Sequence, residues 1–173
     1  MRRNRDILLA LDPGTRHLGF AAFDAFELVD YGIRNVKGQS TVESMLVAVE
    51  RAVRRMICEK RPYALAVEKN NFSQIQQNVR LTMAISRMTA VAKRSRVRVF
   101  EFDPRTIRKA VCNDGNATKR ELARIITASY PEMRAYLESN RRWRERYYQN
   151  AFDAIACGLT FLSQPGNSIR KQT

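Results

Sequence analysis

Three acidic residues stand where an acid is costly unless something neutralises it. Asp12 directly follows the apolar residues 7–11, and Glu68 directly follows the apolar residues 64–67. Asp153 has apolar neighbours on both sides. A carboxylate buried alone is expensive, so each acid must accept hydrogen bonds or bind a cation. Oxygen ligands of this kind suit Mg²⁺ or Mn²⁺, which activate water and stabilise charge when a phosphodiester is hydrolysed.

Each acid also has a purely structural explanation. Asp12 precedes Pro13-Gly14 and fits as the cap of that turn, while Glu68 fits as the strand-end partner of an arginine. Asp153 fits at an exposed helix position, although its apolar neighbours leave little surface for solvent. These alternatives stay open for each acid taken alone. Together, the three acids favour a shared divalent cation.

The whole chain is strongly basic. Its 173 residues include 31 Lys and Arg against 17 Asp and Glu, a formal net charge of +14 at pH 7. A charge of this size attracts polyanions and makes binding depend steeply on salt, so nucleic acid is the expected partner. The basic residues are spread along the chain and are not gathered on one amphipathic helix, which argues against membrane binding.

Cysteine and histidine are too few for other hydrolytic sites. The three cysteines are isolated and odd in number, which argues against a zinc site or a disulfide framework. His17 is the sole histidine, so a Ser-His nucleophile and a histidine zinc site both lack parts. The first apolar run is too short for a signal peptide, and no run is long enough to span a bilayer. We therefore expect a cytosolic protein, bacterial or phage-encoded.

The apolar patterns predict an α/β fold. Strands are expected at residues 7–11, 18–24, 26–34, 64–67 and 97–102, and helices at 41–60 and 73–95, from 103–104, after the 118–121 capping box and at 150–162. This order predicts a mixed five-stranded sheet with helices on both faces. If the strands that end at Asp12 and Glu68 are parallel neighbours, both acids reach one sheet edge. The length fits one domain, residues 1–164, followed by a flexible polar tail at 165–173.

In this order, the motifs resemble the RuvC family of Holliday junction resolvases, within the RNase H-like nuclease superfamily. The family's Asp-Pro-Gly-Ser/Thr segment is matched by residues 12–15, with Gly19 at the expected distance. Its Ala-Ile-Glu strand end is matched by residues 66–68, and its Asp-Ala-x-Asp-Ala helix by residues 150–154. The resemblance covers nearly everything between residues 7 and 162.

The resemblance implies an RNase H-like endonuclease that resolves four-way DNA junctions by cutting opposed strands. It implies Asp12, Glu68 and Asp153 as catalytic residues that hold Mg²⁺, two ions per site, with Mn²⁺ as a substitute. It also implies that Lys119 assists near the scissile phosphate, and a lysine at a helix start suits a phosphate physically. A solvated surface lysine is the alternative.

Asn150 departs from the family pattern, which usually has an acid there. Three residues before Asp153, it shares a helix face with that acid, so its amide oxygen is an expected metal ligand. An amide supplies no charge, however, and an N-terminal helix cap is an equal alternative. The departure therefore keeps a second function open, namely a branched-DNA-binding protein that is weakly active or inactive.

The predicted DNA-binding surface combines basic and aromatic residues. Its members are Phe72, Arg105, Arg108, Lys109, Lys119, Arg120, Arg141, Arg142 and Arg144. Residues 141–148 mix cations with aromatic rings, which can grip phosphates and stack on bases. A solvated linker with Trp143 in the core is the alternative for that stretch. Phe72 resembles a junction-contacting aromatic of relatives, offset by one residue, and a core position is its alternative.

The predicted helix at 73–95 carries two apolar stripes, of which the sheet needs one. Ile75, Val79 and Met83 form one stripe, and the other includes Ile85 and Met88. A second stripe would otherwise face water, so we expect a homodimer. A twofold axis between the two subunits would place one active site at each of two opposed strands of a four-way junction. The nearest rival function is a related RNase H-like nuclease that acts on RNA.

Overall fold

The structure, a computed structural model, describes residues 6–36, 41–69, 78–137 and 142–167. Within these residues, one mixed sheet contains five strands in the order β3-β2-β1-β4-β5. The strands are β1 (Ile7–Asp12), β2 (His17–Asp24), β3 (Glu27–Asn35), β4 (Ala64–Glu68) and β5 (Arg98–Phe102). The first three form an antiparallel meander, and β4 lies parallel to both β1 and β5. The predicted mixed five-stranded sheet is confirmed.

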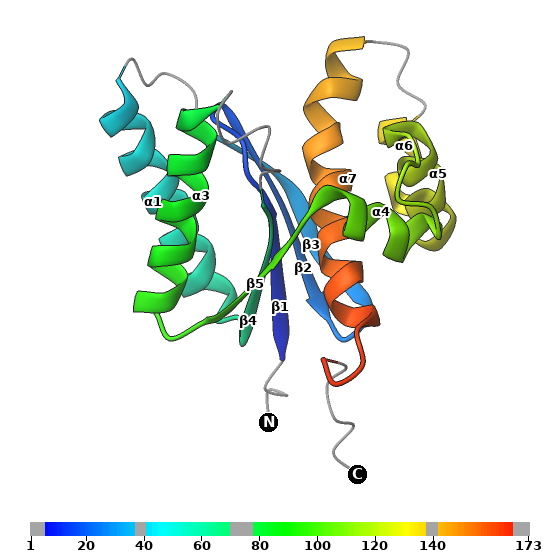
Figure 1. Cartoon of the computed structure of the whole chain (residues 1–173), viewed down its shortest axis with the longest axis horizontal. Helices are drawn as coiled ribbons and strands as arrows, with labels where there is room; N and C mark the ends of the chain where they lie inside the picture. Colours follow the sequence, from blue (N-terminus) through cyan, green and yellow to red (C-terminus); the bar gives the residue numbers. More distant parts are fainter. Residues whose placement is uncertain (1–5, 37–40, 70–77, 138–141, 168–173) are drawn as a thin grey trace.

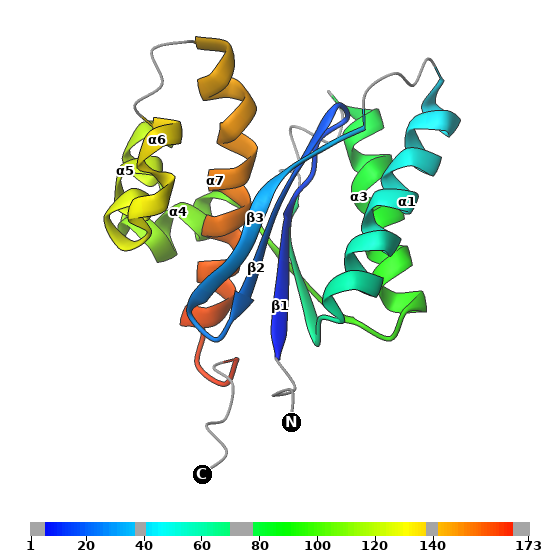
Figure 2. The ribbon, with the colours of Figure 1, turned by 180° about the vertical axis from the view of Figure 1, so that it is seen from behind.

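Helices cover both faces of this sheet, as predicted (Figures 1 and 2). One face carries α1 (Val42–Lys60) and α3 (Val79–Arg94). The other carries α7 (Arg142–Ser163), with α4 (Pro104–Cys112), α5 (Lys119–Ser129), the 3-10 turn η1 (Pro131–Met133) and the short α6 (Arg134–Leu137) around it. Two separate apolar cores result, one on each side of the sheet. None of the described helices is long and apolar enough to cross a membrane.

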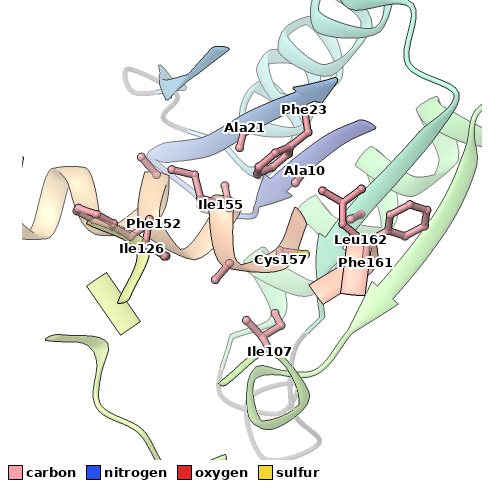
Figure 3. Close-up of a cluster of buried hydrophobic side chains, with 14 of the residues drawn as sticks. Ala10, Ala21, Phe23, Ile107, Ile126, Phe152, Ile155, Cys157, Phe161 and Leu162 are labelled. Atoms are coloured by element: carbon pink, nitrogen blue, oxygen red, sulfur yellow. The ribbon is translucent and has the colours of Figure 1, made fainter. Parts of the chain in front are cut away.

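The core under α7 fixes the distance between that helix and the sheet. Figure 3 shows Phe23 and Ala10 of the sheet among Ile155 and Cys157 of α7. Gly158 permits this close packing, because a Cβ there would lie 2.3 Å from Cε2 of the Phe23 ring. The helix α7 therefore packs directly on β1 and β2. The turns of α7 that precede Gly158 lie near the end of β1, where Asp12 is found.

Two helices begin elsewhere than the sequence pattern predicts. The predicted helix 73–95 is interrupted at Asn78: α3 begins at Val79, because Asn78 leaves helical geometry and its side chain accepts a hydrogen bond from the Leu81 amide. Residues 73–77 lie outside the described residues. The last helix begins at Arg142, eight residues before its predicted start. Its first two turns are polar and basic, and apolar periodicity gives no signal for such turns.

Candidate active site

Three carboxylates converge at one edge of the sheet. In the parallel register Leu11 pairs with Val67, so the next residues, Asp12 and Glu68, lie side by side at the carboxyl ends of β1 and β4. Asp153, on α7, lies near both of these acids. Its charge contributes to the raised pKa values of Asp12 and Glu68. The predicted meeting of the strand ends is confirmed, and the acids come from three separate elements.

The turn after Asp12 is shaped to let α7 approach. A Cβ on Gly14 would lie 2.0 Å from the carbonyl oxygen of His17, which no side chain tolerates. A Cβ on Gly19 would lie 2.0 Å from the carbonyl oxygen of Asn150. The two glycines therefore remove the steric barriers inside the turn and between β2 and α7. This close approach sets Asp153 beside the strand acids.

Burial and neighbouring carboxylates raise the pKa values of Asp12 and Glu68. Burial is the largest cause for Asp12, followed by the Asp153 and Glu68 carboxylates, and together they raise the pKa of Asp12 well above its usual value. Burial and then Asp153 raise the pKa of Glu68 to about 7. Lys119 opposes the shift at both acids. Burial and carboxylate repulsion thus disfavour the charged forms of Asp12 and Glu68.

Asp153 is almost fully buried and held by two side chains. It is 8% exposed, so the alternative of an exposed helix position is wrong. Its Oδ2 accepts a hydrogen bond from Nζ of Lys119 at 3.0 Å, and its Oδ1 accepts one from Nε2 of Gln149 at 3.0 Å. Both oxygens of this carboxylate therefore accept a hydrogen bond.

Lys119 contacts Asp153, and its role near the scissile phosphate stays a prediction. It is the first residue of α5, which Thr118 and Glu121 open with the predicted capping box. Burial lowers the pKa of Lys119, but the Asp153, Asp12 and Glu68 carboxylates outweigh burial and raise that pKa above its usual value. The ammonium therefore stays charged. Its side chain is still 60% exposed, which leaves it open to an incoming anion.

Asn150 lies at the turn of α7 that touches β2. Since α7 begins at Arg142, the helix-cap alternative for Asn150 is wrong. Its Nδ2 donates a hydrogen bond to the carbonyl oxygen of His17 at 2.9 Å. Asn150 therefore joins α7 to the start of β2, close to the Asp12 turn. Its amide oxygen as a metal ligand stays a prediction.

The structure brings Arg108 to the site among the predicted DNA-binding residues. The Arg108 guanidinium, on α4, is one of the charges that lower the pKa of Glu68 against the larger effects of burial and Asp153. Arg105 and Arg120 are exposed on α4 and α5. Nζ of Lys109 donates a hydrogen bond to the Asn113 carbonyl at 3.0 Å, at the end of its own helix. Phe72 and Arg141 lie outside the described residues, as do the side chains of Arg142 and Arg144.

Two residues near the acids were not predicted from sequence. Gln149 holds Asp153, and its spacing of four residues on a helix is a signal that sequence reasoning had available. Asp103, the N-cap of α4, lies near Glu68 and contributes to its raised pKa. Nothing local marks Asp103 as more than a helix cap, because only the pairing of β5 with β4 places it beside Glu68.

The site fits a divalent cation in charge and donor type. Within the described residues, no group of three or more His, Cys, Asp or Glu side chains is arranged to hold a metal ion. Each oxygen of Asp153 accepts one hydrogen bond, from Lys119 or Gln149, and keeps a further lone pair. Burial and neighbouring carboxylates disfavour the charges of Asp12 and Glu68, and a hard cation would stabilise those charges.

The raised pKa of Glu68 predicts that the metal-free protein becomes less stable as pH rises. The ordinary pKa of 4.5 applies to the unfolded chain and about 7 to the folded protein, so the folded state holds an extra proton between these values. By linkage, this stability is fully present below about pH 4.5 and is lost as pH rises through about 7. The loss is on the order of 3 kcal/mol at most.

Thermal denaturation in EDTA between pH 5 and 8 measures this effect, with Glu68→Gln as the comparison. We expect the wild type to lose melting temperature relative to Glu68→Gln as pH rises, because the glutamine does not titrate. Parallel pH profiles for the two proteins would contradict the raised pKa.

Comparison with known proteins places the chain among crossover junction nucleases. The family model described as "Crossover junction endodeoxyribonuclease RuvC" matches residues 8–132. A curated protein of that name from Akkermansia muciniphila is 28% identical over 161 residues, covering 90% of this chain and 89% of the relative. Another from Sorangium cellulosum is 26% identical over 164 residues, covering 92% and 86%.

Solved structures share the fold. Thermus thermophilus RuvC superposes with a TM-score of 0.71 at 21% identity, covering 90% of this chain and 92% of that one. The same protein in complex with a Holliday junction substrate gives 0.69 at 21% identity, with coverage of 90% and 91%. The yeast mitochondrial Holliday junction resolvase Ydc2 gives 0.64 at 11% identity, with coverage of 90% and 78%. The expected RNase H-like fold is confirmed.

Proposed function

Because the chain belongs to the RuvC family of crossover junction endodeoxyribonucleases, we propose that it resolves four-way DNA junctions by metal-dependent hydrolysis of opposed strands. One observation supports this activity most directly. Asp12, Glu68 and Asp153 converge from three elements beside the charged Lys119, so acids and a phosphate-binding cation share one sheet edge.

Asp12, Glu68 and Asp153 would hold magnesium, two ions per site, with manganese as a substitute and the Asn150 amide oxygen as a further ligand. When bound, the metal supplies the Lewis acidity that activates water and offsets phosphate charge. Lys119 orients the scissile phosphate from the N-terminus of α5, where the helix dipole also favours an anion. Gln149 keeps the Asp153 carboxylate aimed at the site.

The basic residues near the site supply the DNA-binding surface in this proposal. Arg105, Arg108, Lys109 and Arg120 stand on α4 and α5, the helices on the Lys119 side of the site. Arg141, Arg142, Arg144 and Phe72 extend the surface as predictions. Contacts to phosphates release counterions, so junction affinity should fall steeply with salt.

The test incubates the protein with a labelled four-way junction and Mg²⁺ or Mn²⁺. We expect paired nicks that leave a 5′-phosphate and a 3′-hydroxyl, and little cutting of linear duplex. Tight junction binding without any nicking in manganese would favour the binding-only function. Faster cutting of RNA than of junction DNA would favour the RNA-directed nuclease.

Asn150→Asp is expected to destabilise the metal-free protein by about 1–3 kcal/mol. The substitution removes the N–H that donates to the His17 carbonyl and turns a carboxylate oxygen toward that carbonyl. Thermal denaturation in EDTA measures the loss, with Asn116→Asp in an exposed turn as the matched control. An unchanged melting temperature, together with tighter magnesium binding, would instead show that Asn150 serves mainly as a metal ligand.

We propose that the protein forms a homodimer through the outward face of α3. Val79 is 61% exposed and Met83 is 40% exposed, although the opposite side of this helix, with Met88, is buried. Light scattering at micromolar concentration should give the mass of a dimer, and Met83→Glu should give that of a monomer. Phe26→Glu, in an exposed turn elsewhere, is the control and should leave the dimer intact. A monomeric wild type would exclude this interface.

A further inference from the structure

A pocket of about 220 Å³ is lined by residues of α5, α6 and α7. Its apolar walls are Tyr136, Leu137 and Phe152. Its polar lining comes from Lys119, Arg120 and Gln149. Pockets for whole organic ligands usually measure about 300–1,000 Å³, so this one has room for a single flat ring system.

The pocket is continuous with the candidate active site. Lys119 and Gln149 line it, and the same two side chains hold the two oxygens of Asp153 at 3.0 Å each. A group in the pocket is therefore one side chain away from the catalytic carboxylate. A phosphate bound at Lys119 would therefore lie at the edge of this pocket.

The aromatic wall is held rigid before any ligand arrives. The ring of Tyr136 packs against Tyr148, with centroids 4.3 Å apart, and edge-on against Tyr31 at 6.0 Å. Phe152 is only 3% exposed and is anchored in the core beneath α7 (Figure 3). Rings that are already locked lose little entropy on stacking, so they suit recognition of a planar partner.

The polar lining favours a nucleic acid group over an apolar ligand. Lys119 and Arg120 place two cations at the pocket, where they match the phosphates on either side of a base. One N–H of Gln149 Nε2 donates to Asp153, which leaves the amide oxygen as an acceptor for a ligand, beside the second N–H. That acceptor suits an N–H on the edge of a base.

We propose that this pocket takes one nucleobase of the strand being cut, next to the scissile phosphate, and that it sets a base preference at that position. The inference rests on the proposed junction cleavage. Tyr136 supplies the stacking surface, and Gln149 supplies an acceptor for the base edge. A base bound in the pocket holds the cut strand in position. The scissile phosphate of that strand then stays beside Lys119 and Asp153.

The experiment replaces single nucleotides beside the cut by abasic sites and measures wild-type cleavage rates in magnesium. One abasic position should slow cleavage by about 5- to 150-fold, the factor that corresponds to about 1–3 kcal/mol of stacking per base. In Tyr136→Leu the same abasic site should change the rate by less than about twofold, because the stacking partner is already missing. Tyr130→Leu, a half-buried tyrosine outside the pocket, is the control and should keep the full abasic penalty.

If Tyr136→Leu unfolds below the assay temperature, Leu137→Trp replaces it. The tryptophan fills the pocket, so the abasic penalty should again be lost. An abasic penalty that persists in the folded variants would overturn the proposal, as would the absence of a penalty at every position in the wild type. If the wild type cuts no junction, the proposed function fails. The abasic comparison, made then by junction affinity without metal, still decides whether a base binds in the pocket.

Discussion

Asp12→Asn should reduce junction cleavage by about 10³-fold or more, and should also make the metal-free protein more stable. The first effect follows because Asp12 is a metal ligand in the proposed function, and loss of a metal ligand removes several kcal/mol of transition-state stabilisation. The second follows because burial and two carboxylates disfavour the Asp12 charge in the folded state. Removing that charge should raise stability by about 1–3 kcal/mol, or roughly 2–4 °C in Tm per kcal/mol.

The two effects are measured by single-turnover cleavage in magnesium and by thermal denaturation in EDTA. Asp6→Asn is the matched control, because it removes the same charge from an exposed residue that directly precedes β1, at the end of the strand opposite Asp12. Magnesium should raise the Tm of the wild type and of Asp6→Asn, and leave that of Asp12→Asn nearly unchanged. Wild-type cleavage by Asp12→Asn would remove this residue from the reaction.

Lys119→Met should bind magnesium more tightly and yet cut more slowly. The ammonium lies 3.0 Å from the Asp153 carboxylate, so it competes with a metal ion for that ligand. Removing it should improve metal affinity by roughly tenfold, a modest factor because 60% of the Lys119 side chain is exposed to solvent. Cleavage should fall by about 10²-fold, since a preorganised cation at the phosphate is lost.

Metal affinity is measured by calorimetric titration of Mg²⁺ into EDTA-treated, dialysed protein, and cleavage by single turnover at saturating metal. Lys109→Met removes an equal charge from the neighbouring helix, where Nζ contacts the Asn113 carbonyl, and it should leave metal affinity unchanged. Weaker magnesium binding by Lys119→Met would mean that the lysine orders Asp153 for the metal and does not compete with it.

The fold and the outline of the site were predictable because their signals are local. Apolar runs that end in an acid mark β1 and β4, and a capping box at Thr118 marks the start of α5. Once two strands are parallel neighbours, their terminal acids must meet, so the pairing of Asp12 with Glu68 follows from element order. The starts of α3 and α7 were not predictable, because Asn78 interrupts an apolar spacing and the polar turns from Arg142 carry none.

By itself, the sequence determined the sheet, the acids at its edge and the basic character of the surface, since these depend on residue types and short spacings. The tertiary structure alone decided what each polar group contacts. Lys119 reaches Asp153 across 34 residues, and Asn150 reaches the His17 carbonyl across 133. No local pattern encodes such contacts, because they exist only after α5 and α7 pack on the sheet. The same packing forms the pocket that Lys119 lines, which we propose as a site for a base.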